Sequence, residues 1–244
     1  MAVSDGTTSL LVDLGLSCRA ICSAAKACAF DPGRASGVLF THDHSDHCKG
    51  AATFRKKFPH VPFYANGATA DAISACTGAE DGWKVFETAT RFAIGGFTVE
   101  PFPVPHDAAD ATGYLLSSGG RSLFVATDLG CATAQVRDAL SRADCAVLES
   151  NHDRALLLAS QRAWPLKQRI LGRSGHLSND DAAELLRECA STRLKTVLLA
   201  HLSEECNSPH LALEAARSAL GDAGCAETAI EILPRGEPSR LYLI

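Results

Sequence analysis

Three histidines and two aspartates lie within residues 42–47, directly after a short apolar run. Because alternate residues of an extended chain face the same side, His42 and His44 can bind one metal ion together. Asp46 and His47 fall where the chain is expected to turn into a helix, so they can face a second ion beside the first. Nitrogen and oxygen ligands without a thiolate favour zinc, with manganese or iron as the other candidates. The segment therefore predicts a site for two divalent metal ions.

The elements that must position these residues follow from the apolar pattern, which alternates between strand-length runs and segments with helical spacing. We expect strands over residues 9–14, 37–40, 62–64, 145–148, 196–200, 230–233 and 241–243, with several short strands between 85 and 126. We expect helices over residues 17–29, 45–58, 68–76, 132–140 and 209–220, two across 154–171 separated at Pro165, and one that begins at Ser178. Paired glycines at 119 and 120 predict a tight hairpin turn, because glycine readily supplies a positive φ.

Strand-rich centres flanked by helices occur twice along the chain, and no linker or low-complexity tract divides it. Sheets and helices of this kind bury their apolar faces by packing in layers. We therefore predict a single domain over residues 1–244, of the α/β (α+β) class, folded as a four-layer αββα sandwich.

The histidine-rich segment resembles the His-x-His-x-Asp-His signature of the metallo-β-lactamase fold, and the expected αββα layers agree with that resemblance. The resemblance implies a hydrolase in which a hydroxide bridging two ions attacks the substrate, with Asp46 orienting the hydroxide. It also implies three further ligands at the C-terminal edges of later apolar runs, namely His106, Asp128 and His201. Taken singly, each of these could instead be an ordinary polar residue at the end of a strand. The resulting ligands exceed the number that one tetrahedral ion can use. The resemblance divides them between two ions: His42, His44 and His106 for the first, Asp46, His47 and His201 for the second, and Asp128 bridging both.

Five later blocks resemble the YycJ (WalJ) branch of that superfamily: residues 107–110, 149–153, 164–171, 175–179 and 200–205. That branch is associated with 5′-to-3′ exonuclease activity on DNA, so the resemblance implies a DNA exonuclease. Its members usually begin with an extra strand and a Gly/Ser-rich turn before the strand at residue 9. This chain begins Met-Ala-Val-Ser-Asp-Gly, so we expect that strand and that turn to be missing.

Several residues are candidates for contact with the substrate. His176 precedes a helix N-terminus, a favourable place for phosphate, where it could hold a phosphate oxygen or protonate the leaving group; a structural cap is the alternative. Residues 154–173 carry five basic residues and no acidic ones, which favours a track for phosphates over a solvated helical face. The predicted substrate contacts are His152, which could instead pair with Asp153, and Asn179, Lys167, Arg169 and Arg173.

The composition bounds these hypotheses. A net charge of −5 excludes a generally basic nucleic-acid coat, and no apolar run or leader suggests a membrane span or secretion, so we expect a cytoplasmic protein. Ten cysteines without a Cys-x-x-Cys pair are expected to be buried free thiols, with Cys48 packed under a helix rather than bound to metal. The sequence does not indicate an oligomeric state.

The leading hypothesis is a dinuclear metal-dependent hydrolase of phosphodiesters, most simply a DNA exonuclease with nucleic acid as its partner. One alternative is a hydrolase of a small ester, thioester or cyclic phosphodiester. Another, from a different class, is a metal-bound scaffold or sensor without turnover. A β-lactamase is disfavoured because Asp128 stands where many such enzymes have a cysteine. A flavodiiron oxidoreductase is disfavoured because His44 stands where a glutamate is expected and there is no flavin domain.

Overall fold

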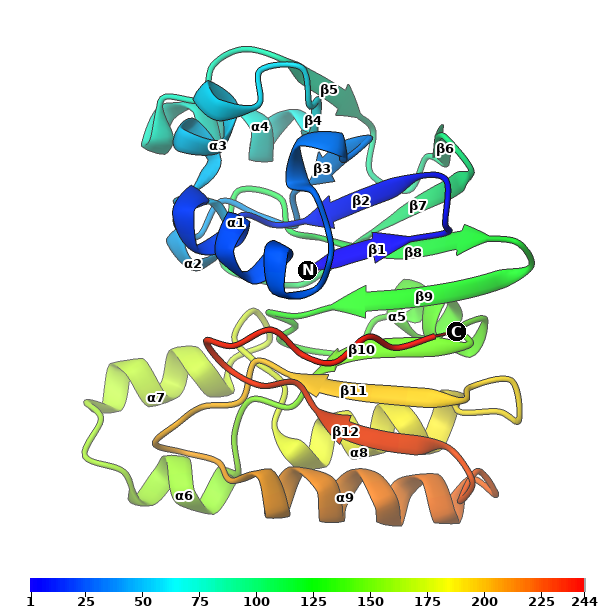
Figure 1. Cartoon of the computed structure of the whole chain (residues 1–244). Coiled ribbons are helices and arrows are strands. Elements are labelled where there is room, and N and C mark those ends of the chain that lie inside the picture. The colour runs from blue at the N-terminus through cyan, green and yellow to red at the C-terminus, as the bar shows by residue number, and fades with distance from the viewer. Residues whose placement is uncertain (244) are drawn as a thin grey trace.

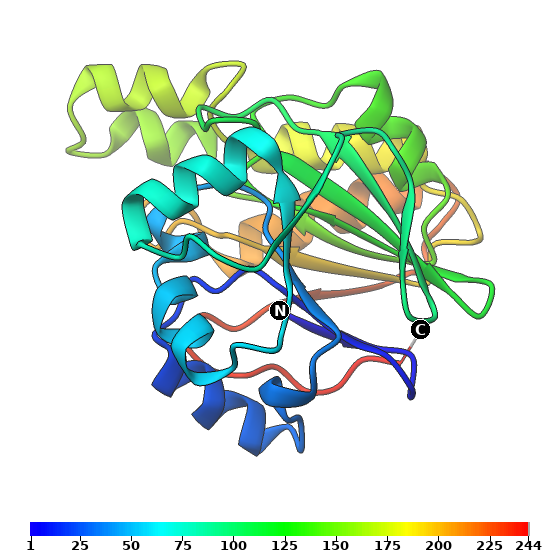
Figure 2. The same cartoon turned by 90° about the horizontal axis from the view of Figure 1, so that it is seen from above.

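The computed structural model describes residues 1–243, in which two β-sheets lie face to face with helices on their outer faces (Figures 1 and 2). The first sheet has the order β1-β2-β3-β4-β5, formed by Ala2–Ser4, Ser9–Val12, Gly37–Leu39, Phe63–Asn66 and Trp83–Phe86. The second has the order β12-β11-β10-β9-β8-β7-β6. From β6 to β12 its strands are Phe92–Ile94, Phe97–Pro103, Thr112–Ser118, Arg121–Ala126, Cys145–Glu149, Thr196–Ala200 and Ala229–Ile232.

The helices follow the strands closely in the sequence. From α1 to α5 they span Cys18–Ala27, Ser45–Cys48, Ala51–Lys57, Gly67–Thr77 and Ala134–Ser141. From α6 to α9 they span Arg154–Ala159, Trp164–Leu171, Asn179–Cys189 and Pro209–Asp222. A short 3₁₀ turn, Pro32–Arg34, precedes β3.

Alternation along the central strands builds three separate apolar cores. On β3, Val38 faces the core beneath α1, α3 and α4, whereas Leu39 faces the core between the two sheets. On β11, Val197 packs beneath α5, α8 and α9, whereas Leu198 faces the core between the sheets. Successive residues of a strand point to opposite faces, so a strand buried on both sides contributes to two cores. The predicted four-layer αββα sandwich is confirmed.

Several local predictions also hold. Ser118 pairs with Arg121 across a two-residue turn, in which Gly119 and Gly120 have φ of 58° and 79°. Ser178 caps α8 and exchanges hydrogen bonds with Asp181 in a capping box. The segment 154–171 does form two helices, but Pro165 lies in the first turn of α7, where proline is tolerated, rather than between them.

Two predictions about elements are wrong, and one strand was not expected. The unexpected strand is β1, where Ala2–Ser4 pairs antiparallel with β2. The absence of the family's extra strand and Gly/Ser-rich turn stays a prediction. Residues 241–243 form no strand, and Leu241 and Leu243 are exposed. The helix expected over 45–58 is two helices, because the chain breaks at Gly50. The N–H of Gly50 donates to the carbonyl oxygen of Leu14 at 2.9 Å. A Cβ atom on Gly50 would lie 2.2 Å from the carbonyl oxygen of Leu16.

Candidate metal centre

The candidate ligands form connected groups of neighbouring side chains. The strands β9 and β11, which precede two of them, end on the same side of the second sheet (Figure 1). His42 follows β3 of the first sheet, and Asp128 and His201 follow the parallel strands β9 and β11 of the second. Asp128 and His201 each have φ of 57°, a left-handed backbone that is unusual for residues with a side chain. Such strain, about 1–3 kcal/mol each, is typical of functional sites, and here it lies at the two strand ends that carry candidate ligands.

The first cluster consists of His42, His44 and His106, whose ligand atoms lie within 4.8 Å of one another. The Nε2 atom of His106 is 3.2 Å from Nδ1 of His44. His42 is buried, and burial together with the neighbouring His47 lowers its pKa to about 4. A neutral imidazole is the form that binds metal. The Nε2 atom of His42 is buried and has no hydrogen-bond partner among the described residues. An atom in that situation is available to bind a metal ion.

The second cluster consists of Asp46, His47 and His201, and Asp128 lies between the two clusters. The Oδ2 atom of Asp46 is 3.8 Å from Nε2 of both His47 and His201. One oxygen of Asp128 lies 3.0 Å from Nε2 of His47, and the other lies 3.8 Å from Nε2 of His106. A single carboxylate that is 2% exposed therefore reaches histidines of both clusters.

The carboxylates around the second cluster hold its imidazoles in the charged form. Burial opposes the charge on His47, but Asp13 and Asp128 outweigh it and raise the pKa of His47 to about 10. Burial likewise opposes the charge on His201, yet its neighbours Asp46, Glu149 and Asp128 raise the pKa of His201 to about 11. A divalent cation would replace these protons, so its binding would release protons. The donor set and the unpartnered His42 atom fit divalent metal ions.

Asp13, which the sequence analysis missed, orients His47. Its carboxylate accepts hydrogen bonds from the N–H and hydroxyl of Thr41, at 2.8 and 2.9 Å, and lies 2.8 Å from Nδ1 of His47. His47 therefore presents Nε2 to Asp128. Asp13 is an acidic residue that follows an apolar run, as Asp128 does. Its position at the end of that run could have identified it in the sequence. Partners of this kind fix the ring orientation of metal-binding histidines.

Glu149, also missed, organises two histidines at once. It is fully buried, and its Oε1 atom lies 2.9 Å from Nδ1 of His176 and 2.7 Å from Nδ1 of His201. Its other oxygen accepts hydrogen bonds from the N–H groups of Leu129 and Leu177. Burial alone would raise the pKa of Glu149, but the two imidazoles lower it. Both rings therefore keep Nε2 free to face other groups.

The short helix α2, which carries Asp46 and His47, is fixed by the loop after β2. A Cβ on Gly15 would lie 1.5 Å from the carbonyl oxygen of Asp46, so only glycine permits this approach. The N–H of Leu14 donates to the carbonyl of His47 at 2.7 Å. A single helical turn is unstable alone, and these contacts hold it against the first sheet.

His176 lies at the candidate metal centre, with Nδ1 3.6 Å from Asp128 Oδ1. Burial disfavours its charge, but the hydrogen bond to Glu149 outweighs burial and raises the pKa of His176. It joins Asp128, Glu149 and His201 in a further group of residues able to hold a cation. The structure thus brings together every predicted ligand, and His176 with them.

Three predicted substrate contacts have buried side chains, and their role in binding the substrate stays a prediction. The Nζ atom of Lys167, a residue 8% exposed, donates to the carbonyls of Leu158 and Ser160 and holds the connection between α6 and α7. The amide of Asn179 is bonded to Ser150 and Asn207 at the start of α8. His152 is buried with both ring nitrogens unpartnered among the described residues. The predicted alternative, pairing with Asp153, is not formed, since Asp153 caps α6.

The basic segment is largely neutralised by acidic residues from other parts of the fold. Arg169 forms an ion pair with Asp107, beside His106. Arg154 pairs with Asp181 at 2.7 Å, and Arg162 pairs with Glu205 at 2.8 Å. Arg173 is exposed and makes no ion pair with any described residue. A continuous track of free cations is therefore absent from residues 154–173, and substrate contacts by Arg169 and Arg173 remain predictions.

The cysteines are less uniformly buried than expected. Cys48 is buried in the core next to α3 and belongs to none of the candidate ligand groups, as predicted. Its Sγ lies 3.9 Å from Sγ of Cys76, however, and Cys76 is exposed. Cys28 is exposed as well. The prediction of buried thiols is wrong for those two positions.

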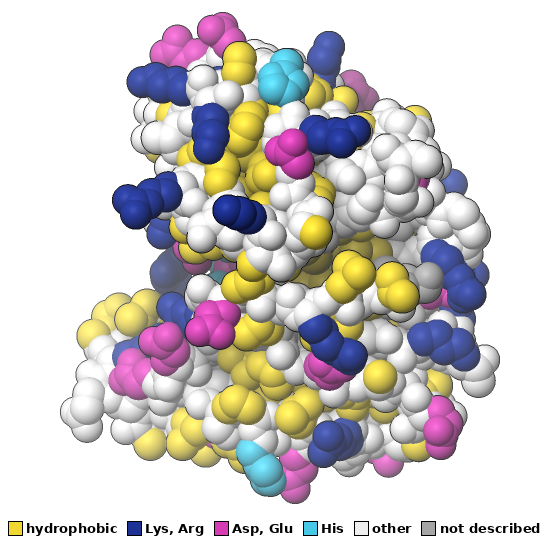
Figure 3. All heavy atoms as spheres, viewed as in Figure 1, with side chains coloured by type: hydrophobic (Ala, Val, Ile, Leu, Met, Phe, Trp, Pro, Cys, Tyr) yellow, Lys and Arg dark blue, Asp and Glu magenta, His cyan; other side chains and the backbone are white. Residues whose placement is uncertain are grey.

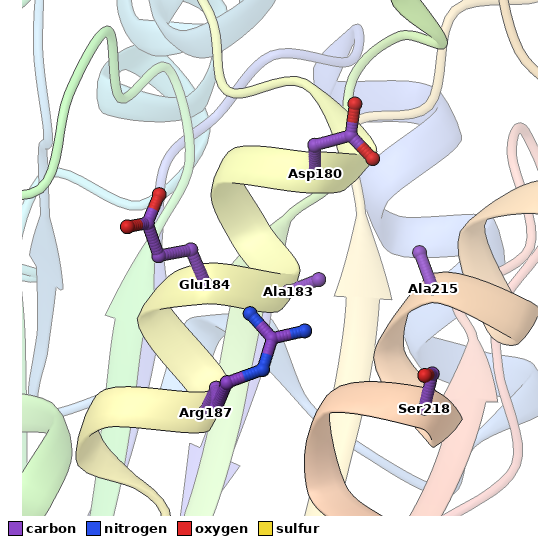
Figure 4. A pocket seen from close by; sticks show the side chains of 6 residues that line it. All are labelled: Asp180, Ala183, Glu184, Arg187, Ala215 and Ser218. Atoms are coloured by element: carbon purple, nitrogen blue, oxygen red, sulfur yellow. The ribbon is translucent and has the colours of Figure 1, made fainter. Parts of the chain in front are cut away.

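A shallow groove between α8 and α9, of about 360 Å³, lies apart from the metal ligands (Figure 4). The side chains between the two helices are small, and the charged side chains at the groove come from α8. The lining residues are Asp180, Ala183, Glu184, Arg187, Ala215 and Ser218. None of them is a candidate ligand, and Arg187 is already paired with Asp222 at 3.1 Å.

Residues 1–243 contain no helix with the length and apolar character that a membrane crossing requires.

The fold and the site together define a metal-dependent hydrolase of the metallo-β-lactamase fold. Residues 8–201 match the family described as the Beta-lactamase superfamily domain. Exodeoxyribonuclease YycJ of Bacillus anthracis is 35% identical over 217 residues, 88% of this chain and 82% of that protein. Exodeoxyribonuclease WalJ of Streptococcus pneumoniae is 36% identical over 207 residues, 83% of this chain and 77% of that protein. The chain belongs to the YycJ/WalJ family within the β-lactamase superfamily.

Solved structures support the fold. The Zn²⁺-bound PqqB of Methylobacterium extorquens superimposes with a TM-score of 0.73 at 17% identity, covering 99% of this chain and 86% of that protein. The metallo-β-lactamase fold protein YhfI of Bacillus subtilis gives a TM-score of 0.71 at 17% identity, covering 95% and 87%. The resemblance to the metallo-β-lactamase fold and to the YycJ (WalJ) branch is thereby confirmed.

Proposed function

We propose that the protein is a dinuclear metal-dependent exonuclease that hydrolyses phosphodiester bonds of DNA in the cytoplasm. The observation that carries the proposal is the position of Asp128, whose two oxygens face histidines of two adjacent ligand clusters. His42, His44 and His106 would hold one ion, and Asp46, His47 and His201 the other. Zinc suits these nitrogen and oxygen ligands best, with manganese or iron as the other candidates.

Divalent ions at such a site supply Lewis acidity and lower the pKa of bound water to about 7. The protein's own groups then have distinct tasks. Asp128 keeps the two clusters at a fixed separation, and Asp46 lies where it can orient the attacking water. Burial opposes the charge on Asp128 and Asp46, but pairing with imidazoles outweighs burial and lowers the pKa of both carboxyl groups, so both stay ionised at neutral pH.

Glu149 and His176 form a pair suited to proton donation. The hydrogen bond from Nδ1 of His176 to Glu149 favours the protonated ring and turns Nε2 away from the carboxylate. A sugar oxygen that leaves from a phosphodiester needs a proton, and a positioned imidazolium can supply it. We assign this role to His176, in place of a structural cap.

DNA is the substrate that the relatives favour, since the related YycJ and WalJ proteins are named exodeoxyribonucleases. The exposed Arg173, together with Arg169 beside Asp107, could contact phosphates next to the centre. The neutralised basic segment favours the second candidate, hydrolysis of a small ester, thioester or cyclic phosphodiester.

Degradation of end-labelled single- and double-stranded DNA tests the proposal. We expect metal-dependent release of mononucleotides or short products from an end, with loss of activity on chelation. Turnover of bis(p-nitrophenyl) phosphate without degradation of DNA would favour the small-substrate alternative. A protein that binds metal but turns over neither compound would be a scaffold or sensor.

Metal stoichiometry is a separate prediction. Because two clusters share one bridging carboxylate, we expect two equivalents of metal per chain after saturation with zinc, manganese or iron and removal of the excess. Inductively coupled plasma mass spectrometry gives the count. One equivalent or less for all three metals would contradict the dinuclear assignment.

A further inference from the structure

The helices α6 and α7 form an arm that projects from the sandwich beside the metal centre (Figures 1 and 2). This helical arm, residues 154–171, carries large apolar side chains that are not buried by the rest of the fold. Trp164 is 58% exposed, and Leu158 is 50% exposed. Leu156 and Leu166 are exposed too, and hydrophobic side chains gather over this part of the surface (Figure 3). Exposed apolar patches on a soluble domain commonly mark binding surfaces.

The helical arm is continuous with the metal centre. At the end of α7, the carbonyl of Ile170 accepts a hydrogen bond from the N–H of His176 at 3.0 Å. Arg169 on the same helix pairs with Asp107, the neighbour of the candidate ligand His106. The helix α7 therefore lies next to the candidate metal centre, where a polymer held at the ions could contact it.

The chemistry of the helical arm suits a nucleic acid. Residues 154–173 contain no carboxylate, and the acidic side chains beside them, Asp107, Asp181 and Glu205, are each paired with an arginine of the segment. Three of its arginines are already paired, which leaves Arg173 as the cation available to a phosphate. An exposed tryptophan offers a different interaction, because unpaired bases stack on aromatic rings whatever their sequence.

We propose that Trp164 stacks on an unpaired base of a DNA strand whose end is held at the metal centre. The proposal rests on the function proposed above and specifies how a polymer is distinguished from a small substrate. Trp164 begins α7, and eight residues at about 1.5 Å each place it roughly 12 Å from the end next to His176. A small phosphodiester bound at the centre is therefore not expected to reach Trp164, whereas a strand of several nucleotides can.

The test compares substrates of different length. We expect Trp164→Ala to lower kcat/KM about tenfold on a 20-nucleotide oligothymidylate. Turnover of a thymidine dinucleotide and of bis(p-nitrophenyl) phosphate should remain unchanged, because neither reaches Trp164. Trp164→Phe should keep most of the activity on the long substrate, since it retains an aromatic ring. Leu241→Ala, which removes an exposed apolar side chain in the C-terminal segment, is the matched control and should behave like the wild type.

Fluorescence separates this proposal from the exonuclease assignment. Trp83, the other tryptophan, is held by hydrogen bonds from its indole N–H to Ser74 and Ala79, so quenching that differs between wild type and Trp164→Phe reports on Trp164. Quenching by oligothymidylate without cleavage would support stacking on Trp164 and overturn the nuclease function. Cleavage without quenching would support the nuclease function and overturn stacking on Trp164. Equal losses on long and short substrates would overturn the proposal. So would a wild-type dimer that Trp164→Ala dissociates in light scattering, because the patch would then join two copies.

Discussion

Replacing Asp128 with alanine is expected to abolish hydrolysis, with a loss of at least about 1000-fold in kcat on both DNA and bis(p-nitrophenyl) phosphate. The carboxylate lies between the two ligand clusters, and its removal leaves two adjacent cations without a shared anion. Their repulsion at short distance in a buried site should also expel one ion. Steady-state kinetics measure the first effect, and elemental analysis should show fewer than two equivalents of metal.

The fold is expected to survive this change, because the three apolar cores do not involve Asp128. Circular dichroism should therefore show the same secondary structure for the variant. Asp71→Ala, which removes an exposed aspartate on α4, is the matched control and should retain activity. Wild-type turnover by Asp128→Ala would mean that the ligand assignment is wrong.

The second large effect is expected for His176→Ala, and it should depend on the leaving group. On DNA the rate should fall by about 100- to 10,000-fold, the usual contribution of a positioned general acid. On bis(p-nitrophenyl) phosphate it should fall much less, because p-nitrophenolate leaves without a proton. His210→Ala, at an exposed position on α9, controls for the loss of a histidine.

The pH profile provides an independent check of His176. Glu149 raises the pKa of His176, so the protonated donor persists to higher pH than a free imidazole would. Glu149→Gln should remove that charge and move the alkaline limb of kcat to lower pH. Equal losses on both substrates for His176→Ala, with an unchanged alkaline limb for Glu149→Gln, would show that His176 holds metal or structure rather than a proton.

The candidate metal ligands could be predicted from the sequence because four of them form a compact pattern, and the resemblance to the metallo-β-lactamase fold points to His106, Asp128 and His201 at the ends of later apolar runs. The His42–His47 spacing depends only on local backbone geometry, and the strand ends that carry Asp128 and His201 follow from alternation and run length. The layers were predictable for the same reason, since strands such as β11 are apolar on both faces.

The surroundings of other residues could not be predicted, because they depend on how separate segments of the chain pack together. Lys167 looked like a surface cation, but its ammonium group is bound by two carbonyls at the α6–α7 connection. Arg162 and Glu205 are 43 residues apart, so their pairing could not be inferred from a local count of charges. The role of Glu149 could not be predicted, because it requires His176 and His201 to approach the same carboxylate oxygen.

The origin of the ligands in two different sheets has a consequence for folding. His42, Asp46 and His47 belong to the half of the chain built on β3 and α2, whereas His106, Asp128 and His201 belong to the half built on the second sheet. Metal ions bound between the two halves would cross-link them without a covalent bond, and they would stabilise only the conformation in which both halves are docked. By mass action, ions present at 1000 times their dissociation constant would add about 4 kcal/mol to the free energy of unfolding. The concentration of available metal would thus determine the stability of the folded protein as well as its rate of turnover.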